Sequence, residues 1–382
     1  MLSTLFFLLF CAVVSGSSLY CPPQQFSCAP TTVCSVQAPD SASCACLAAS
    51  ALQRVYCDDW FESWLPSMWQ TAVGIECMSN YAAYGAPLTN RSAVLAAVKR
   101  VASAKDSILL IAEDPDAYDD LLWFSIAFAR LYELSGDPVD LQQAQTVFDY
   151  VYGQSWDTAA CGGGFYWSAS RDYKNAITNE LGIVAAYRLA KLLGPSSRYG
   201  AIGDTALAWF LGSGMINAHG LVNDGLFMQN CSNNGQTPWT YNQGVIYLGL
   251  AYGAERQPRN ATQYAKLAQH MFAAVASRLT NANGVLVEAL PGDPYNDSDQ
   301  FVFKGIYVRY LRYLRDAMHS LLPAAFVRAV DRFLATQKTN AIANDMQNSL
   351  YGAFWEGPFN GRFNNKTGAT QISAVDMLVA NL

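Results

Sequence analysis

Stretches with helical periodicity, separated by loops rich in Gly, Asn, Asp and Pro, limit the folds open to this chain. Apolar residues recur every three or four positions in these stretches, and the alternation typical of strands is scarce. The predicted helices are Ala93–Ala112, Asp119–Leu134, Leu141–Tyr152, Asn179–Leu193, Thr205–Leu211, Gln243–Tyr252, Ala261–Leu279, Val302–His319, Ala324–Gln337 and Gln371–Val379. One or two more near Trp60–Tyr81 and one near Ser349 bring the number to about twelve.

So many helices without a strict repeat motif suggest either a helical solenoid or a closed double ring of helices. The chain is 52% hydrophobic and only 14% charged, which is enough for one large buried core. In a closed ring the long connections gather at one face and can form a site there. The loops of this chain are rich in aromatic and amide residues, which favours the ring.

The N-terminal residues predict a secretory signal peptide over residues 1–18. Leu2–Val14 are almost entirely apolar and are followed by small residues, although no Lys or Arg precedes them. The alternative is an uncleaved anchor. No later segment is long and apolar enough to span a membrane, so we expect a secreted, extracellular protein. Five Asn-x-Ser/Thr sequons agree with secretion: Asn90, Asn230, Asn260, Asn296 and Asn365.

Cysteines crowd the segment that follows, residues 19–57, ahead of a single domain over residues 58–382. The chain has 10 cysteines, and nine remain once Cys11 leaves with the signal peptide. Secretion favours disulfides, and an odd count implies one free or intermolecular thiol. A metal site is the alternative, but no His and no zinc-type spacing occurs among these cysteines.

Charge and composition exclude several classes of function. The net charge is -6 and no basic patch appears, which argues against nucleic acid or an anionic membrane as a partner. The three histidines are far apart in the sequence, so a His-based metal site or a Ser-His-Asp triad is not expected. No phosphate-binding Gly-rich loop occurs, and nothing calls for a metal or cofactor.

Two adjacent carboxylates, Asp119 and Asp120, stand at the start of a predicted helix, with Trp123 one turn further on. Cleavage of a glycosidic bond needs two carboxyl groups, one to protonate the leaving oxygen and one to attack or to activate water. The alternative is that acidic residues simply cap the helix and suit its dipole. A second pair, Asp58-Asp59, has the same acidic and aromatic character, so the local pattern alone does not choose between them.

Three loops carry further candidate residues. The first, CGGGFYW at 161–167, joins glycines that permit close backbone approach to aromatics that can stack on a sugar. The second runs from Asn223-Asp224-Gly225 to Trp239-Thr240-Tyr241-Asn242, and the third spans residues 174–180. Amides and carboxylates at helix starts can hydrogen-bond to neighbouring hydroxyls. The alternative in each case is helix capping plus core aromatics.

The order of these motifs resembles glycoside hydrolase family 76, the endo-α-1,6-mannanases and related fungal cell-wall enzymes thought to be transglycosylases. The matching segments after the Asp pair are CGGGFYW, KNAITNEL, WTYNQGVIYLGL, FKGIYVRYL and GAFWEGPF. The resemblance covers residues 58–382 and implies an all-α fold, an (α/α)6 barrel, preceded here by the Cys-rich segment. It also implies a retaining double displacement on a mannan polysaccharide, with Asp119 as nucleophile and Asp120 as general acid/base.

The resemblance and the loops together give the expected site. The expected sugar contacts are Trp123, Trp167, Asn175, Asp224, Trp239, Tyr241 and Asn242. Trp123 could equally be a core residue. Cys161 and Cys231 flank two of the site loops, and we predict a disulfide between them. Lys304 could reach the cleft or pair with a structural carboxylate. Phe124 stands where the family usually has a second Trp, and the Cys-rich segment lies outside the family core.

Three functions are compatible with these residues. The first is a secreted hydrolase of α-1,6-mannan, and the second is a cell-wall transglycosylase that passes the glycosyl-enzyme to a sugar acceptor. The third is a binding protein with a sugar cleft and no chemistry. The intact Asp119-Asp120 pair argues against the third, because binding alone needs no such like-charge arrangement.

Overall fold

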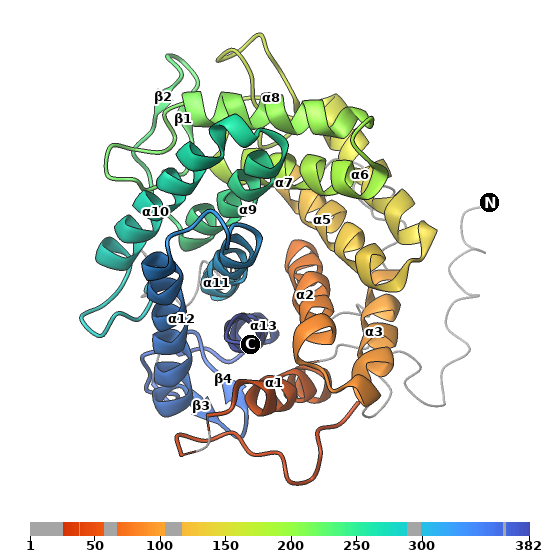
Figure 1. The fold of residues 1–382 in the computed structure, drawn as a ribbon, viewed down its shortest axis with the longest axis vertical. Coiled ribbons are helices and arrows are strands. Elements are labelled where there is room, and N and C mark those ends of the chain that lie inside the picture. The colour runs from red at the N-terminus through yellow and green to blue at the C-terminus, as the bar shows by residue number, and fades with distance from the viewer. Residues whose placement is uncertain (1–25, 38, 57–66, 104–116, 289–298, 362–363) are drawn as a thin grey trace, which may run out of the picture.

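The computed structural model describes residues 26–37, 39–56, 67–103, 117–288, 299–361 and 364–382, and within them twelve α-helices form two concentric rings (Figure 1). The inner ring consists of α2 (Met68–Asn80), α5 (Tyr118–Ser135), α7 (Ala176–Leu193), α9 (Thr240–Arg256), α11 (Gln300–Ala317) and α13 (Gly368–Ala380). The outer ring consists of α1 (Ser41–Val55), α3 (Leu88–Ser103), α6 (Pro138–Ser155), α8 (Arg198–Gly212), α10 (Ala261–Arg278) and α12 (Ala324–Asn344).

The inner ring is closed. Each inner helix packs against the next inner helix in chain order, and α13 returns to α2. Each outer helix packs on an inner one, as α6 does on α5 and α8 on α7. The expected all-α (α/α)6 barrel of about twelve helices is therefore confirmed, and the solenoid is excluded.

Burial explains why the periodic pattern of apolar residues is clear in some helices and weak in others. The inner helix α7 is buried at every residue from Ala176 to Ala190, since it touches ring neighbours as well as α8. The outer helix α10 buries one face, including Tyr264 and Met271, and exposes the other. An amphipathic stripe is expected only where one side faces solvent. None of the described helices is long and apolar enough to cross a membrane.

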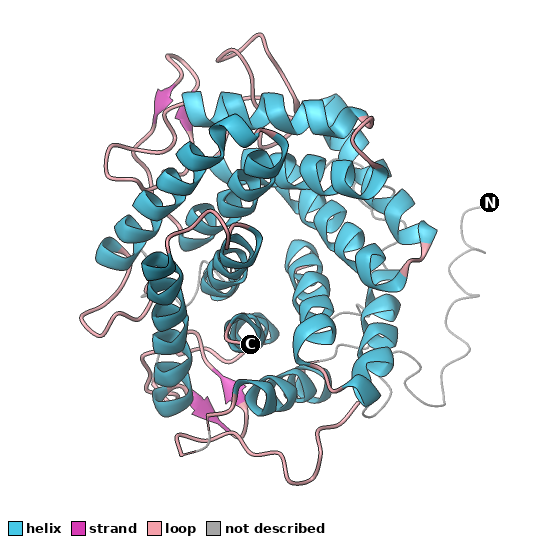
Figure 2. Ribbon diagram, in the orientation of Figure 1, coloured by secondary structure: helices cyan, strands magenta, loops and turns pink. Residues whose placement is uncertain are grey.

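Other regular elements are short and lie in the connections (Figure 2). They are a π-helical turn (Tyr81–Gly85), a 3-10 turn (Pro258–Asn260) and the strands β1 (Leu226–Phe227), β2 (Ser232–Asn233), β3 (Met346–Gln347) and β4 (Leu350–Tyr351). The strands form two antiparallel hairpins, β1–β2 and β3–β4. Glycines occupy many of the bends where φ is positive, whereas the turn of the β3–β4 hairpin is made by Asn348 and Ser349.

The Cys-rich segment contributes a helix to the barrel. Residues 41–55 form α1, which packs against α13, and disulfides Cys28–Cys46 and Cys34–Cys44 fasten the preceding loop to α1. Cys77 is a free thiol buried in α2. The predicted signal peptide, Cys21, Cys57 and the Asp58-Asp59 pair lie outside the described residues.

A buried acid lies inside this barrel on α7. Glu180 is fully buried, neither carboxyl oxygen has a hydrogen-bond partner, and burial raises its pKa well above the usual range. The folded state therefore holds this proton more tightly than the unfolded chain does. That contribution to stability is complete below the ordinary glutamate pKa and is lost as pH rises through the raised pKa.

Replacing Glu180 by Gln, which cannot ionise, is expected to flatten the decline in unfolding free energy at rising pH. At about pH 8 the variant should be more stable than the wild type by about 1 kcal/mol or more. Urea unfolding across the pH range measures this. Glu255→Gln is the control, because the Glu255 side chain is 60% exposed. Parallel pH curves for the wild type and Glu180→Gln would contradict the prediction.

Candidate active site

The first turns of five inner helices meet around one cavity of about 540 Å³. Helix N-termini present free N–H groups and the positive end of the helix dipole, which suits oxygen-rich ligands. The described residues that line the cavity are Ser67, Trp69, Ala117, Asp119, Asp120, Trp123, Trp167, Tyr173, Asn175, Asp224, Tyr241, Asp299 and Phe303. Of the nine residues expected to touch sugar or carry the chemistry, seven line it.

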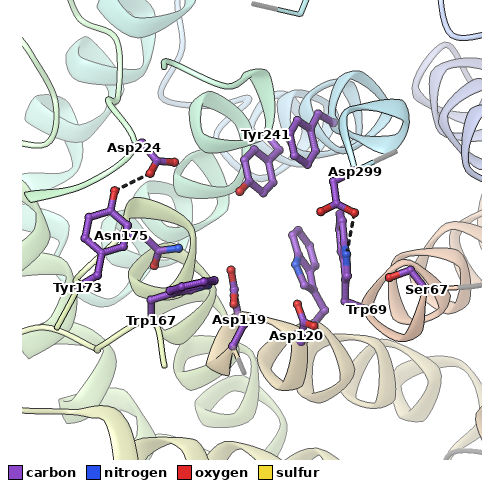
Figure 3. Close-up of a pocket in the computed structure, with 13 residues that line it drawn as sticks. Ser67, Trp69, Asp119, Asp120, Trp167, Tyr173, Asn175, Asp224, Tyr241 and Asp299 are labelled. Carbon is purple, nitrogen blue, oxygen red and sulfur yellow. Dashed lines mark hydrogen bonds between the residues drawn. The ribbon is translucent and has the colours of Figure 1, made fainter. Parts of the chain in front are cut away.

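The Asp119-Asp120 pair occupies the first turn of α5, and both side chains line the cavity (Figure 3). Asp119 is 9% exposed, whereas Asp120 is more accessible. Burial raises the pKa of Asp119 to about 7, and the negative charge of Asp224 adds to the rise. The backbone amides of Asp119 and Asp120 and the side chain of Asn175 lower the pKa and so oppose that rise. Asp119 Oδ1 is buried without a hydrogen-bond partner.

Trp167 forms an exposed aromatic face beside the pair. Its side chain is among the more exposed large hydrophobic groups, at 39%. The backbone N–H of Tyr118 donates to the carbonyl oxygen of Trp167 (2.6 Å). The backbone N–H of Trp167 donates to the carbonyl oxygen of Tyr173 (2.8 Å). These bonds tie the ring to the start of α5, so Trp167 is held next to Asp119 and is free to stack on a sugar face.

The Gly-rich loop before Trp167 has a different role from the one expected. A Cβ on Gly163 or Gly164 would collide with the ring of Trp209 on α8, and both glycines have positive φ. Phe165 and Tyr166 are buried rather than exposed to the cavity. The close backbone approach therefore serves packing inside the protein, and only the last residue of the motif contributes to the cavity.

Lys174 and a disulfide hold this loop in place. The buried Lys174 ammonium donates to the carbonyl oxygens of Ala160 and Gly163, both at 2.7 Å. Cys161 is joined to Cys231, 70 residues away, at the tip of the β1–β2 hairpin. The loop that ends in Trp167 is thus connected to the loop that carries Asp224.

Replacing Cys161 and Cys231 together by Ala is expected to lower the unfolding free energy by about 2–4 kcal/mol, because the bond closes a long loop. It should also raise KM for the substrate more than it lowers kcat, since the bond positions Trp167 and Asp224 rather than the Asp pair. Chemical denaturation and steady-state kinetics measure the two effects. An unchanged KM would show that the two loops keep their positions without the bond.

Asp224 is the third carboxylate of the cavity. Burial raises its pKa, and the side chains of Tyr173 and Trp239 hydrogen-bond to it and oppose the rise. Tyr173 donates to Asp224 Oδ2, and Asn234 donates to the Tyr173 hydroxyl (2.9 Å). Asp224 is therefore held in one orientation by a chain of side chains from two loops.

An aromatic wall closes the opposite side. Tyr241 stacks face to face on Phe303, with ring centroids 3.9 Å apart and an interplanar angle of 6°. Trp69 packs against both Phe303 (6.3 Å) and Trp123 (6.0 Å). Trp123 is 2% exposed, so it belongs to the core and lines the cavity at its edge. Trp123 is thus a core residue that also lines the cavity, so each of its two predicted roles, sugar contact and core residue, stays compatible with the structure.

Trp239 and Asn242 are not among the described residues that line the cavity. Trp239 is the N-cap residue of α9 and packs edge-on against Phe303 at 5.7 Å. Asn242 is completely buried, and its amide atoms have no hydrogen-bond partner. Successive helical residues point about 100° apart, so Asn242 turns away when Tyr241 faces the cavity.

Several cavity residues were not expected from the sequence. Trp69 Nε1 and Gln70 Nε2 each donate to Asp299 Oδ1 at 3.1 Å, which joins the start of α2 to the start of α11. Asp299 is the N-cap residue of α11. A Trp at a helix start and an Asp at an N-cap were the available signals, but both patterns are common in helical proteins.

Lys304 is not among the described residues that line the cavity. Its side chain is buried, its ammonium donates to the carbonyl of Ala353 (2.6 Å) and lies 4.9 Å from the ring centre of Trp355. Burial lowers its pKa, although the charges of Glu356, Glu288 and Asp345 oppose this. Within the described ranges, no group of three or more His, Cys, Asp or Glu side chains is arranged to hold a metal ion.

Comparison with known proteins agrees with this architecture. The model of glycosyl hydrolase family 76 matches residues 54–382. The chain is 25% identical to the mannan endo-1,6-alpha-mannosidase DCW1 of Saccharomyces cerevisiae over 339 residues, which are 81% of this chain and 71% of that protein. The Candida albicans protein of the same name is 31% identical over 45% of this chain and 39% of its own.

Solved structures show the same fold. The GH76A alpha-1,6-mannanase of Salegentibacter sp. HEL1_6 superposes with a TM-score of 0.76 at 20% identity, covering 90% of this chain and 99% of that one. An inactive variant of that mannanase in complex with alpha-1,6-mannotriose gives a TM-score of 0.75 at 19% identity, with the same shares covered. The family model extends over most of the chain, and this chain therefore belongs to glycosyl hydrolase family 76.

Proposed function

We propose that this chain is a secreted, retaining glycoside hydrolase that cleaves α-1,6-mannosidic linkages within mannan. Asp119 is the nucleophile and Asp120 is the general acid/base. The observation that carries the proposal is the convergence of these adjacent carboxylates on one cavity with aromatic walls (Figure 3). A retaining double displacement requires two carboxyl groups close together at the scissile bond.

The surroundings of each carboxylate support these roles. Asp119 lies deeper, and although burial raises its pKa to about 7, the neighbouring amides oppose that rise, so that the anion is accessible near neutral pH. Asp120 is nearer the opening. There it can protonate the leaving oxygen and then exchange its proton with solvent.

The relatives support the substrate class. Proteins named mannan endo-1,6-alpha-mannosidases align with this chain, and the Salegentibacter mannanase is inactive in the mannotriose complex when two adjacent aspartates are replaced by asparagine. The exposed ring of Trp167 suits stacking on a sugar. Asp224 and Asn175 provide polar groups for hydroxyls.

Product analysis on linear α-1,6-mannan tests the proposal. The expected result is release of short oligosaccharides whose new reducing ends first appear in the α configuration, as NMR can follow before mutarotation. Products of inverted configuration would overturn the retaining mechanism. Extension of an added oligosaccharide acceptor without release in water would replace hydrolysis by transglycosylation, and binding without either reaction would leave a sugar-binding protein.

The pH dependence of kcat/KM shows which residue of the Asp119-Asp120 pair is the nucleophile and which is the acid. With the pKa of Asp119 raised to about 7, an attacking Asp119 is increasingly ionised as pH rises. We expect kcat/KM to fall about tenfold for each pH unit below 7 and to level off above it. A fall in kcat/KM as pH rises through the same region would assign the acid role to Asp119 instead.

A further inference from the structure

Asn175 connects the capping of a helix to the proposed nucleophile. It is the N-cap residue of α7, and its Oδ1 accepts the backbone N–H of Thr178 (3.3 Å). The same side chain lines the cavity beside Asp119 (Figure 3), and it lowers the pKa of that carboxyl. Since the oxygen is used by the cap, the amide group that faces the carboxylate is the NH₂ donor. Figure 3 shows the Asn175 amide beside Asp119.

The backbone around Asn175 is held from several directions, so the amide has little freedom to move away. Asn175 forms an isolated β-bridge with Gly225, and the N–H of Ala176 donates to the carbonyl of Asp224 (2.7 Å). Asn179 Nδ2 donates to the carbonyl of Asn175 (2.8 Å). The side chain is 6% exposed. A donor fixed in this way costs little reorganisation when the carboxylate gains charge.

The described part of the cavity lining carries no cationic side chain. Among the described residues that line the cavity there is no Lys, Arg or His. The titratable groups around Asp119 are acidic or phenolic: Asp120 on its own helix, Asp224 and Tyr173 from loops, Tyr241 on α9 and Asp299 at the start of α11. Among the described residues, the groups that favour an anionic Asp119 are neutral: the backbone amides at the start of α5 and the side chain of Asn175.

We propose that Asn175 is a positioning residue that keeps Asp119 in its ionised, attacking form while its oxygen caps α7. The inference rests on the proposed role of Asp119 as nucleophile. It differs from a sugar contact, because Asn175 then acts on the nucleophile before any substrate is bound. It also differs from a purely structural cap, because any good capping residue would serve that purpose.

Two substitutions separate the functions of this side chain. Asp and Ser are both good N-cap residues, so Asn175→Asp and Asn175→Ser keep the cap on α7. Neither donates an amide N–H to Asp119, and Asp adds a negative charge. We expect the ascending limb of kcat/KM to move to higher pH by about one pH unit or more in Asn175→Asp, and by less in Asn175→Ser. At about pH 6, Asn175→Asp should lose at least about tenfold in kcat/KM, with little change in melting temperature.

A second readout does not depend on turnover. NMR titration of isotope-labelled aspartate carboxyls, with Asp119→Asn used to assign the signal, should show the Asp119 pKa higher in Asn175→Asp than in the wild type. Asp40→Asn is the matched control, an Asp/Asn exchange at the N-cap of α1 where Asp40 accepts the N–H of Ser43 (2.8 Å). It should leave the pH profile in place.

The outcomes distinguish this inference from the proposed function. An unmoved Asp119 titration and pH profile in Asn175→Asp would overturn the inference even if the wild type cleaves mannan. A loss confined to KM would make Asn175 a sugar contact only, and a loss that follows the melting temperature would make it a cap only. A raised Asp119 pKa in an enzyme that does not cleave mannan would uphold the inference and reject the proposed substrate.

Discussion

Asp119→Asn is expected to lower kcat on α-1,6-mannan by about 10⁴-fold, because an amide cannot form the glycosyl-enzyme bond. Asp120→Asn is expected to lower it by about 10²- to 10⁴-fold, the usual contribution of general acid/base catalysis. Asn is nearly isosteric with Asp, so neither change should unfold the barrel. Steady-state kinetics on mannan, with melting temperatures for the folded state, measures both effects.

The choice of substrate separates the two variants. An aryl mannoside with an acidic phenol as leaving group needs no proton, so Asp120→Asn should form the glycosyl-enzyme from it and Asp119→Asn should not. Azide should then release glycosyl azide of retained configuration from Asp120→Asn. Asp172→Asn, an exposed aspartate in the loop after Trp167, is the control and should keep full activity. Residual activity above about a tenth in Asp119→Asn would remove Asp119 from the nucleophile role.

Glu76→Leu is expected to lower the unfolding free energy by about 3–5 kcal/mol, because it removes the buried carboxylate that the guanidinium groups of Arg188 and Arg309 share. Glu76 is 1% exposed and receives Arg188 Nη1 (2.9 Å) from α7 and Arg309 Nη1 (2.8 Å) from α11. Arg309 also binds Asp376 of α13, and Arg188 donates to the carbonyl of Ile126 in α5 (3.1 Å). Five of the six inner helices thus share one charged network.

The contribution of Glu76 to stability depends on pH with the opposite sign to that of Glu180. Burial alone would raise the pKa of Glu76, but the charges of Arg188 and Arg309 outweigh it and lower the pKa to about 2. Its contribution is present above the ordinary glutamate pKa and is lost as pH falls toward about 2. Glu76→Leu should therefore reduce the acid sensitivity of unfolding as well as the stability.

Chemical denaturation near neutral pH gives the size of the Glu76 effect. The exposed pair Lys191–Glu255 (2.8 Å) is the matched control, since Glu255→Leu removes one partner at the surface and should change stability by less than about 1 kcal/mol. Equal losses in the two variants would mean that the buried network does not hold the inner ring together.

Local sequence patterns predicted much of the fold. The period of apolar residues identified most helices, but several were predicted too short: α7 begins at Ala176, directly after its cap Asn175, and α8 begins at Arg198, seven positions before the predicted start Thr205. Residues 41–55 gave no clear helical signal, since Ala, Ser and Cys provide few large apolar positions. Packing against α13 places that segment in the outer ring.

The sequence by itself determined the family motifs, the helical class and the Asp119-Asp120 pair at the start of a helix. It also predicted the Cys161–Cys231 pairing that the structure contains. Each of these features depends on residues near one another in the chain or on a motif with a fixed order.

The membership of the cavity was decided only by the tertiary structure. Trp69 and Asp299 are 230 residues apart, and they meet because closing the ring brings the first turns of α2 and α11 together. The same closure turns Asn242 into the protein and gives Asn175 both a helix to cap and a carboxylate to hold. Helical periodicity states which face of one helix is apolar. Which helix ends converge depends on contacts that a local pattern does not contain.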